Sequence, residues 1–260
     1  MTTSLKLFKI GGGIIDDAGQ LQQFLREFAG VVGPKILFHG GGRGANDLLK
    51  ALGREPQMVN GRRITDAATL ELVTMFYAGK TNKQMVAQLQ WLGVNALGLS
   101  GADGNAILAS KRPVGTIDYG FVGDVAEGGV NVSLLSTLLQ AGLTPVFCAI
   151  THDGKGQLLN TNADTIASTV ACALAPHYDV ELHFCFEKDG VLLDVHDASS
   201  VIPTITAARY AELKSAGIIA AGMLPKLDNA FAALAAGVQR VIIENALKIN
   251  QPIKTILCQR

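Results

Sequence analysis

The feature that most constrains the fold is a regular alternation of short apolar segments with segments of helical periodicity along all 260 residues. Ser4–Ile10 and Lys35–His39 have the length and apolar content of buried strands. Between them, Leu21, Phe24 and Phe28 recur at the spacing of one helix face. Because parallel strands are usually joined by helical crossovers, this alternation predicts an α/β fold with a mostly parallel sheet.

The alternation continues to the far end of the chain. Asp66 precedes a long periodic stretch that we expect to form one helix, or two helices broken near Gly79, with Asp66 as the N-cap. Residues 106–113 and 118–125 suggest a β-hairpin connected through Val114 to Ile117. Further strands are predicted in 94–101, 144–150, 180–186 and 240–244, and further helices in 47–52, after Asn131, and in 163–174, 207–215 and 225–236.

Composition excludes several classes of protein. Lys and Arg together number 22, as do Asp and Glu, so no overall charge excess points to a nucleic acid or an anionic membrane surface. No segment approaches the roughly 18 apolar residues that a membrane span needs. The four cysteines lack CxxC spacing, which favours reduced, buried thiols. We therefore expect a cytoplasmic globular protein, either one large domain or two lobes that share a sheet.

Two glycine runs follow the first two predicted strands, Gly11–Gly13 after Ile10 and Gly40–Gly42 after His39. Glycine lets a chain turn tightly and lets its backbone N–H groups approach an anion closely. In an open parallel sheet, ligands bind at the carboxyl ends of the strands. Two such runs at successive strand ends therefore suggest one extended anion-binding cradle, although either run alone could be a simple tight turn.

Two familiar nucleotide motifs fit these glycines poorly. Gly40, Gly42 and Ala45 formally satisfy the GxGxxG/A pattern of dinucleotide-binding folds, but no acidic residue ends a strand about 20 residues later. A phosphate-binding loop of the GxxxxGK[ST] type fails at "GKT" (79–81), because Thr74 stands where that motif requires glycine.

Five polar residues near predicted strand and helix ends could serve an anion site, and each also has an ordinary structural explanation. Lys9 could be a solvent-facing strand lysine and Lys226 an exposed lysine at a helix start, where a cation opposes the helix dipole. Asp164 and Asn160 could act as caps. Arg63 could belong to a surface ion pair, or could hold a carboxylate with two hydrogen bonds.

Taken in order along the chain, "KIGGG", "HGGG", "NGRRIT", "LLNTNAD" and "AGMLPK" resemble the motifs of the amino acid kinase family. Within it, they are most similar to the kinases that phosphorylate N-acetyl-L-glutamate in arginine biosynthesis. The resemblance implies a single domain spanning 1–260, a three-layer αβα sandwich around an open, mainly parallel eight-stranded sheet. It implies that an N-terminal lobe (1–178) binds the acylglutamate and that a C-terminal lobe (179–260) binds ATP.

The resemblance also implies roles for individual residues. The strand lysine would contact the transferring phosphoryl group, and an aspartate would orient the two lysines. The implied catalytic residues are Lys9, Asp164 and Lys226. The implied acylglutamate-binding residues are Gly41, Gly42, Arg63 and Asn160. The implied nucleotide-binding residues are Gly11 and Gly12, as backbone donors to the phosphates, together with Glu187, Lys188, Gly190, Gly222 and Lys226.

The implied chemistry needs no general base, because a γ-carboxylate is already ionised at neutral pH. The difficulty is to bring one anion against a polyanion, which positioning and neutralisation of charge can overcome. We expect ATP with Mg²⁺ carried by the nucleotide, and no metal held by protein side chains. N-acyl-L-glutamate and ATP are the expected partners.

The sequence departs from the family pattern in three places. "FEKDGV" replaces a "TDVPGV"-like nucleotide loop, so the contacts of Glu187 and Lys188 with ATP stay open. Arg62 replaces an apolar residue and could favour N-succinyl-L-glutamate, or could simply be exposed. The first predicted strand begins about four residues in, without the N-terminal helix that links arginine-inhibited members into hexamers; we therefore expect a homodimer without arginine feedback.

Two other classes of function compete with a kinase. A nicotinamide-dependent oxidoreductase would use "GGGRGA" but requires an acid near residue 60, which is missing. A non-catalytic sensor with a kinase-like fold would be expected to lack one of Lys9, Asp164 and Lys226, and all three are present. Carbamate kinase and aspartokinase activities leave "NGRRIT" beside "NTNAD" unexplained.

Overall fold

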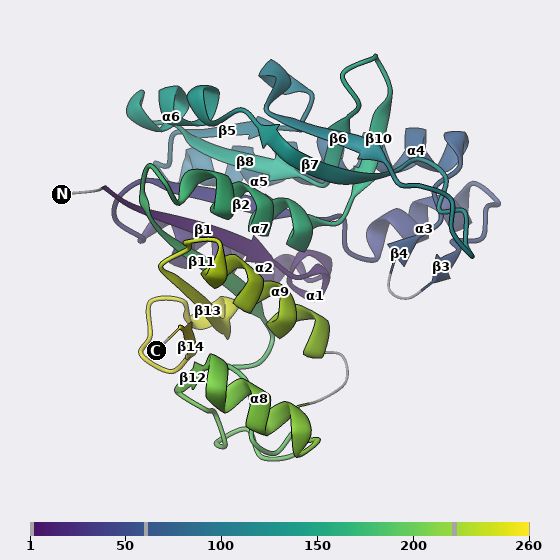
Figure 1. Ribbon diagram of the computed structural model, residues 1–260. Coiled ribbons are helices and arrows are strands. Elements are labelled where there is room, and N and C mark those ends of the chain that lie inside the picture. Colours follow the sequence, from purple (N-terminus) through teal and green to yellow (C-terminus); the bar gives the residue numbers. More distant parts are fainter. Residues whose placement is uncertain (1–2, 60–61, 220–222, 260) are drawn as a thin grey trace.

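An eight-stranded sheet runs through the computed structural model, which describes residues 3–59, 62–219 and 223–259 (Figure 1). Neighbouring strands are parallel except for the antiparallel β13–β14 pair. The predicted mainly parallel sheet is confirmed. Its order is β12 (Thr204–Thr206), β14 (Thr255–Cys258), β13 (Arg240–Asn245), β11 (Asp179–Phe186), β1 (Ser4–Ile10), β2 (Lys35–His39), β8 (Thr144–Cys148), β5 (Ala96–Leu99).

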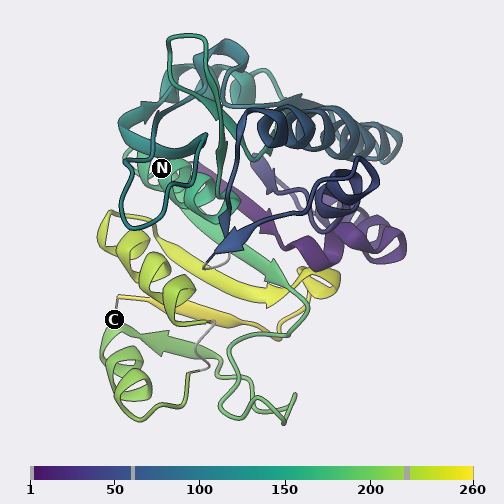
Figure 2. The ribbon, with the colours of Figure 1, turned by 90° about the vertical axis from the view of Figure 1, so that its right-hand side faces the viewer.

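Helices cover both faces of the sheet, so the predicted three layers are also confirmed (Figure 2). Side chains alternate along each strand: Leu5 and Leu7 of β1 pack against one helical layer, and Phe8 and Ile10 against the other. The first layer holds α6 (Val132–Gln140), α7 (Ala163–Leu174), α8 (Ala207–Ser215) and α9 (Leu224–Ala235), and the second holds α2 (Ala18–Ala29) and α5 (Asn82–Trp91).

The long periodic stretch after Asp66 is helical throughout but not regular. Asp66 caps α4 (Ala67–Thr74) by accepting the Thr69 N–H at 2.7 Å, as predicted. A π-helical segment, η1 (Met75–Thr81), then leads directly into α5. The predicted single long helix is therefore confirmed as one continuous helical stretch, with a π-helical segment, and no break, around Gly79. Tyr77 and Thr81 are the buried residues of η1, and π-helical segments often occur at functional sites.

A second set of strands closes on itself in the order β10-β7-β6-β9. The predicted hairpin is confirmed as the antiparallel pair β6 (Ile107–Lys111) and β7 (Val122–Val130), although its connection is longer than expected. The strand predicted over 144–150 divides after Cys148, and its end belongs to β9 (Ile150–His152). The remaining strands are β10 (Leu158–Thr161), β3 (Met58–Val59) and β4 (Arg62–Arg63), and the remaining α-helices are α1 (Gly12–Asp16) and α3 (Gly44–Ala51).

Lys35 is buried where α2 ends, although lysine rarely lies inside a protein. Its ammonium group donates to the carbonyls of Phe28 at 2.8 Å, Ala29 at 3.2 Å and Val31 at 2.6 Å. The last carbonyls of a helix have no partner within the helix, so this side chain satisfies them. Burial lowers the Lys35 pKa to about 8, which leaves the group mainly charged at neutral pH.

Replacing Lys35 with methionine should destabilise the fold by about 2 kcal/mol, because three buried or partly buried carbonyls would lose a charged donor. The measurement is urea unfolding of both proteins at pH 7. Lys50→Met, at an exposed position in the last turn of α3, is the control and should change stability by less than about 0.5 kcal/mol. A Lys35→Met variant as stable as the parent would contradict this role.

Candidate active site

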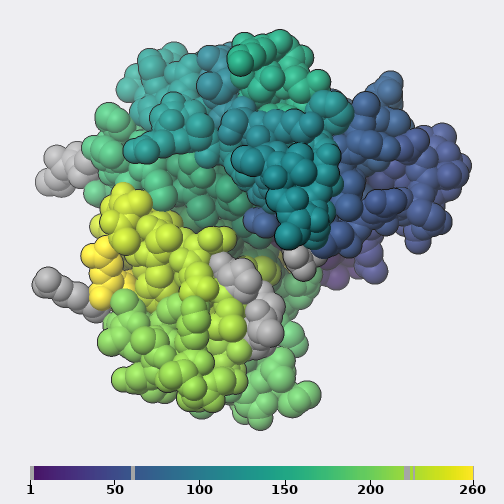
Figure 3. Space-filling view, turned by 45° about the vertical axis from the view of Figure 1, so that its right-hand side comes forward, coloured from purple at the N-terminus to yellow at the C-terminus, as the bar shows by residue number. Residues whose placement is uncertain are grey.

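A cleft of about 580 Å³ opens at the carboxyl ends of β1 and β2. Figure 3 shows a side of the molecule on which the C-terminal part of the chain (green to yellow) meets the part that precedes it (teal to blue). Ligands of open α/β sheets bind at this end of the strands, because the loops there are free to carry polar groups. The cleft brings together Lys9, Gly12, Gly41, Gly42, Arg63, Asn160, Asp164 and Glu187 among the predicted site residues.

The two glycine runs touch each other. The sheet register pairs Ile10 with His39, so both runs begin at the same level. A Cβ atom on Gly12 would lie 3.1 Å from Gly42 Cα, and Gly42 has a φ of +58°, which favours glycine. A Cβ atom on Gly41 would overlap the Tyr77 ring, which η1 places over the loop. Tight packing between the loops therefore explains why some of these positions are glycine, whether or not an anion binds there.

Lys9 and Asp164 form an ion pair, with 2.7 Å between Lys9 Nζ and Asp164 Oδ1. Lys9 shares the strand face of Leu7, and that face is covered by α7, which carries Asp164 in its first turn. Asn162 caps α7 by accepting the Thr165 N–H at 3.0 Å. The side chain of Lys9 is only 11% exposed, so it is not the solvent-facing strand lysine that the sequence also allowed.

Lys226, in the first turn of α9, lies close to this pair. Its ammonium group stands 3.8 Å from the centroid of the Phe186 ring. Burial lowers the Lys226 pKa; the nearby Lys9 charge lowers it further, and the charges of Asp164 and Glu187 oppose the change. Lys226 and Asp164 form no ion pair here, so the structure pairs the aspartate with Lys9 alone. A cation that is half-buried and repelled by a neighbouring cation is a favourable place for an anion.

A second pocket, of about 190 Å³, adjoins the cleft near Lys226. Its lining is mainly apolar and includes Val191, Leu192, Ile219 and Ile243. The predicted nucleotide-binding residues Glu187, Lys188 and Gly190 also line it. Glu187 lines both hollows and so stands where they meet. Gly222 lies outside the described residues.

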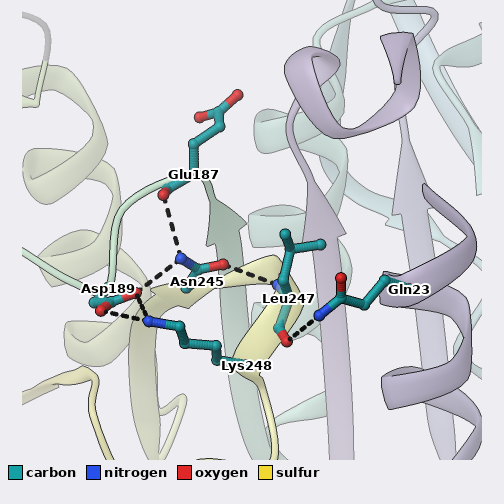
Figure 4. Close-up of polar contacts among 6 residues, drawn as sticks. All are labelled: Gln23, Glu187, Asp189, Asn245, Leu247 and Lys248. Atoms are coloured by element: carbon teal, nitrogen blue, oxygen red, sulfur yellow. Dashed lines mark hydrogen bonds and ion pairs between the residues drawn. The ribbon is translucent and has the colours of Figure 1, made fainter. Parts of the chain in front are cut away.

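The loop that follows β11 is fixed by a polar network (Figure 4). Asn245 Nδ2 donates to the Glu187 carbonyl at 3.2 Å and to Asp189 Oδ1 at 2.7 Å. Lys248 Nζ lies 2.9 Å from Asp189 Oδ2, and its hydrogen bond lowers the Asp189 pKa. In the close-up, the Glu187 carboxylate points away from this network. The network therefore holds the backbone of the unusual "FEKDG" segment and leaves the Glu187 side chain available to the cleft.

Arg63 occupies the opposite end of the cleft as a buried cation, only 7% exposed. Within the described part of the chain, its buried Nε and Nη1 atoms have no hydrogen-bond partner. Asn160, at the end of β10, donates to Thr65 Oγ1 at 3.0 Å beside it. Arg62, one residue earlier on β4, is exposed and lines the rim. Arg63 is thus not one end of a surface ion pair, as the sequence also allowed. It is a buried guanidinium with at least two N–H-bearing atoms that have no acceptor among the described residues.

One predicted contact does not fit the structure. Gly11 was expected to offer its N–H group to phosphates, but that group donates to the Cys185 carbonyl at 3.1 Å. The bond continues the β1–β11 ladder by one residue beyond the end of the strand. Gly12 and Gly13 are the first residues of α1, where N–H groups have no partner within the helix. The donors on this side are therefore Gly12 and Gly13.

Sequence reasoning missed the residues that hold the second glycine run. His39 is fully buried, and burial lowers its pKa to about 4, so the ring is neutral at pH 7. Its Nδ1 atom lies 2.7 Å from the Gly40 carbonyl, which requires a proton on Nδ1. Asn82, the first residue after η1, donates to His39 Nε2 at 3.0 Å. The "HGGG" run itself was the only signal, because Asn82 is 43 residues away.

Two further observations bear on the chemistry of the site. In the described ranges, no cluster of three or more His, Cys, Asp and Glu side chains could hold a metal ion. His39, the histidine that precedes the glycine run, keeps a fixed neutral form and so is not poised to exchange protons. The arrangement suits a reaction in which two anions meet and charge is neutralised by fixed cations and N–H donors.

Comparison with known proteins assigns this fold and site to a class. The family model described as "Amino acid kinase family" matches residues 4–245. The chain belongs to that family. It is 55% identical over 247 residues to the acetylglutamate kinase of Parabacteroides distasonis, which covers 95% of this chain and 96% of that protein. It is 38% identical over 245 residues to the acetylglutamate kinase of Methanopyrus kandleri, which covers 93% of this chain and 95% of that protein.

Solved structures share the same architecture. A Streptococcus mutans protein superposes with a TM-score of 0.77 at 26% identity, covering 98% of this chain and 99% of that chain. Carbamate kinase from Giardia lamblia bound to AMP-PNP superposes with a TM-score of 0.67 at 14% identity, covering 100% of this chain and 99% of that chain. At that identity the likeness concerns the fold alone. Across the described residues, no helix is both long and apolar enough to cross a membrane.

Replacing Arg63 with methionine should raise the stability of the ligand-free protein by about 1 kcal/mol, because the variant removes a buried charge whose polar atoms lack partners. Thermal unfolding without ligand measures this as a higher Tm. Arg62→Met, at the exposed neighbouring position, is the control and should leave Tm almost unchanged. A clear loss of stability in ligand-free Arg63→Met would show that Arg63 supports the fold itself.

Proposed function

We propose that the protein transfers the γ-phosphoryl group of ATP to the γ-carboxylate of N-acetyl-L-glutamate, giving the acyl phosphate used in arginine biosynthesis. The observation that carries this proposal is the pair of touching glycine runs with the buried, unpartnered Arg63 at one end of the cleft and Lys226 near the other. Curated relatives that match nearly the full chain at 52% identity or more are named acetylglutamate kinase, which supports the choice of acceptor.

The acceptor binds between the second glycine run and β4. Arg63 holds the α-carboxylate through its free guanidinium N–H groups, and Asn160 helps to fix the substrate. The γ-carboxylate then lies against the N–H groups of Gly41 and Gly42. Among the described residues, no group accepts a hydrogen bond from these two N–H groups, so they are available. In this arrangement the N-terminal lobe, 1–178, binds the acyl amino acid.

ATP binds on the other side of the glycine contact, against the C-terminal lobe, 179–260. The apolar pocket beside Phe186 has the character of a purine site, and Glu187, Lys188 and Gly190 line it. Thr255 and Val201 pack so closely against Gly190 that no larger residue fits there, so its contribution is to the shape of the pocket. The N–H groups of Gly12 and Gly13 and the Lys226 ammonium group then meet the phosphates.

The catalytic work is electrostatic. Lys9, held by Asp164, stabilises the charge on the phosphoryl group as it moves from ATP to the acceptor oxygen. The γ-carboxylate attacks as the ionised nucleophile, so no proton has to be removed. Mg²⁺ carried by ATP would neutralise part of the charge on the phosphate oxygens. Asp164 is paired with Lys9 and so serves to orient the lysine.

N-succinyl-L-glutamate is the weaker alternative acceptor. It was suggested by Arg62, but Arg62 is exposed at the rim, and the curated relatives carry the acetylglutamate name.

We also propose that the enzyme acts in the cytoplasm as a homodimer. The exposed Trp91, at the end of α5, and the exposed Val32, after α2, supply apolar surface that a second copy could cover. Gel filtration with light scattering measures the mass directly.

The direct test of the activity is trapping of the acyl phosphate with hydroxylamine after incubation with ATP and Mg²⁺. N-acetyl-L-glutamate should give the hydroxamate with the highest kcat/KM, ahead of N-succinyl-L-glutamate, while glutamate, aspartate and carbamate should give little. Equal turnover of glutamate would contradict the proposal, because the acyl group would then make no contribution.

Lys9→Ala and Lys226→Ala should each lower kcat by about 10²–10³-fold, the cost typical of removing one transition-state donor. Both variants should stay folded by circular dichroism, and Lys9→Ala leaves the Asp164 carboxylate without its partner. Lys155→Ala, at an exposed position between β9 and β10, is the matched control. A kcat close to that of the parent in Lys9→Ala or Lys226→Ala would contradict the proposed active site.

A further inference from the structure

A carboxylate that lines the edge of the cleft also joins the two glycine runs. Asp16, the last residue of α1, follows the first run, and its Oδ1 atom accepts the backbone N–H of Arg43 at 2.6 Å. Its Oδ2 atom accepts from Arg43 Nε at 3.2 Å. Arg43 directly follows the second run, 27 residues later in the chain. The Asp16 side chain is 13% exposed, whereas that of Arg43 is 80% exposed.

The same carboxylate explains why position 42 must be glycine. A Cβ atom on Gly42 would overlap Asp16 Oδ1 and would lie 3.1 Å from the Gly12 carbonyl oxygen. The φ of +58° at Gly42 adds a second reason. Gly42 thus makes room for Asp16 as well as for a substrate, and the aspartate sits directly against the backbone of the acceptor loop.

The neighbouring aspartate shows that the contact is not a simple helix cap. Asp17 caps α2 by accepting the N–H groups of Gly19 at 2.8 Å and Gln20 at 3.0 Å, which lie in its own helix. Asp16 instead reaches across to a loop from the next strand. Both carboxylates therefore accept hydrogen bonds from backbone N–H groups. Asp17 accepts from its own helix, whereas Asp16 accepts from the other glycine loop.

A negative charge beside a cradle for anions opposes the binding of those anions. The ion pair with Arg43 is mostly exposed and therefore weak compensation. The hydrogen bond to the Arg43 N–H gives a structural reason for an aspartate at this position, despite its unfavourable negative charge. That bond holds the loop at Arg43, and no acceptor for the N–H groups of Gly41 and Gly42, which line the cleft, is found among the described residues.

We propose that Asp16 is a positioning residue that locks the acceptor-side loop to the phosphate-side loop, so that their N–H groups keep the spacing that one phosphoryl transfer requires. This inference rests on the proposed kinase function. Reacting groups must be held close to the productive geometry, and a displacement of about 1 Å can cost on the order of 10²-fold in rate. In this role Asp16 acts through the loops, because it holds the Arg43 N–H that directly follows the second run.

The test compares Asp16→Ala, Asp16→Asn and Asp17→Ala by steady-state kinetics and thermal unfolding. Asp16→Ala should lower kcat by about 10–100-fold while the KM of each substrate changes far less. Asp16→Asn should recover most of kcat, because its amide oxygen can still accept the Arg43 N–H. Asp17→Ala should lower Tm, through loss of the α2 cap, and leave kcat within about twofold.

Two results would overturn the proposal: a kcat for Asp16→Ala within about threefold of the parent, or an Asp16→Asn variant as slow as Asp16→Ala. The second would mean that charge, not the bond to the loop, is what counts.

Hydrogen exchange of the ligand-free protein separates this inference from the kinase proposal. Amide exchange in the segment 40–47 should be faster in Asp16→Ala than in the parent and close to the parent in Asp16→Asn. If the parent makes no hydroxamate, the kinase proposal fails while the exchange result still reports the loop contact. If the parent is active but amide exchange in 40–47 is the same in Asp16→Ala as in the parent, the positioning role of Asp16 is rejected and the kinase proposal stands.

Discussion

Contact between the backbones of the two glycine runs is the constraint on which the rest of the site depends. β1 and β2 are parallel neighbours, and such strands lie about 4.8 Å apart, so the loops that leave them have almost no room for side chains. Gly12 meets Gly42, Tyr77 covers Gly41, and Asp16 fills the space beside Gly42. The same glycines line the cleft, so on the proposed function structure and binding use one set of residues.

The charges around this contact are arranged so that the ligand-free protein leaves them incompletely satisfied. Arg63 is buried, and its Nε and Nη1 atoms have no hydrogen-bond partner among the described residues; the pKa of Lys226 is lowered mainly by burial. Buried cations without partners cost stability, and substrates that bring carboxylate and phosphate groups would recover that cost as binding energy. Lys9 differs, because Asp164 holds it at 2.7 Å and so fixes the direction of its ammonium group before any substrate binds.

The sequence predicted most of the sheet because strand and helix patterns are local. It also pointed to Lys9 and Asp164, which stand at a strand end and a helix start. It could not give the Asp16–Arg43 contact or the reach of Asn82 to His39, since both depend on loops packed together over long sequence separations. Helical periodicity cannot reveal η1, whose turn is wider than that of an α-helix. The ladder bond of Gly11 depends on strand register, which was likewise not visible.

The most direct test of the central claim is a crystal structure with ADP, Mg²⁺, aluminium fluoride and N-acetyl-L-glutamate, in which the fluoride complex mimics the phosphoryl group in transit. We predict that its fluorine atoms lie within hydrogen-bond distance of N–H groups from both glycine runs and of Lys9, with the γ-carboxylate on the Gly41–Gly42 side. A complex in which only one run contacts the fluoride, or in which the acylglutamate binds away from Arg63, would contradict the account.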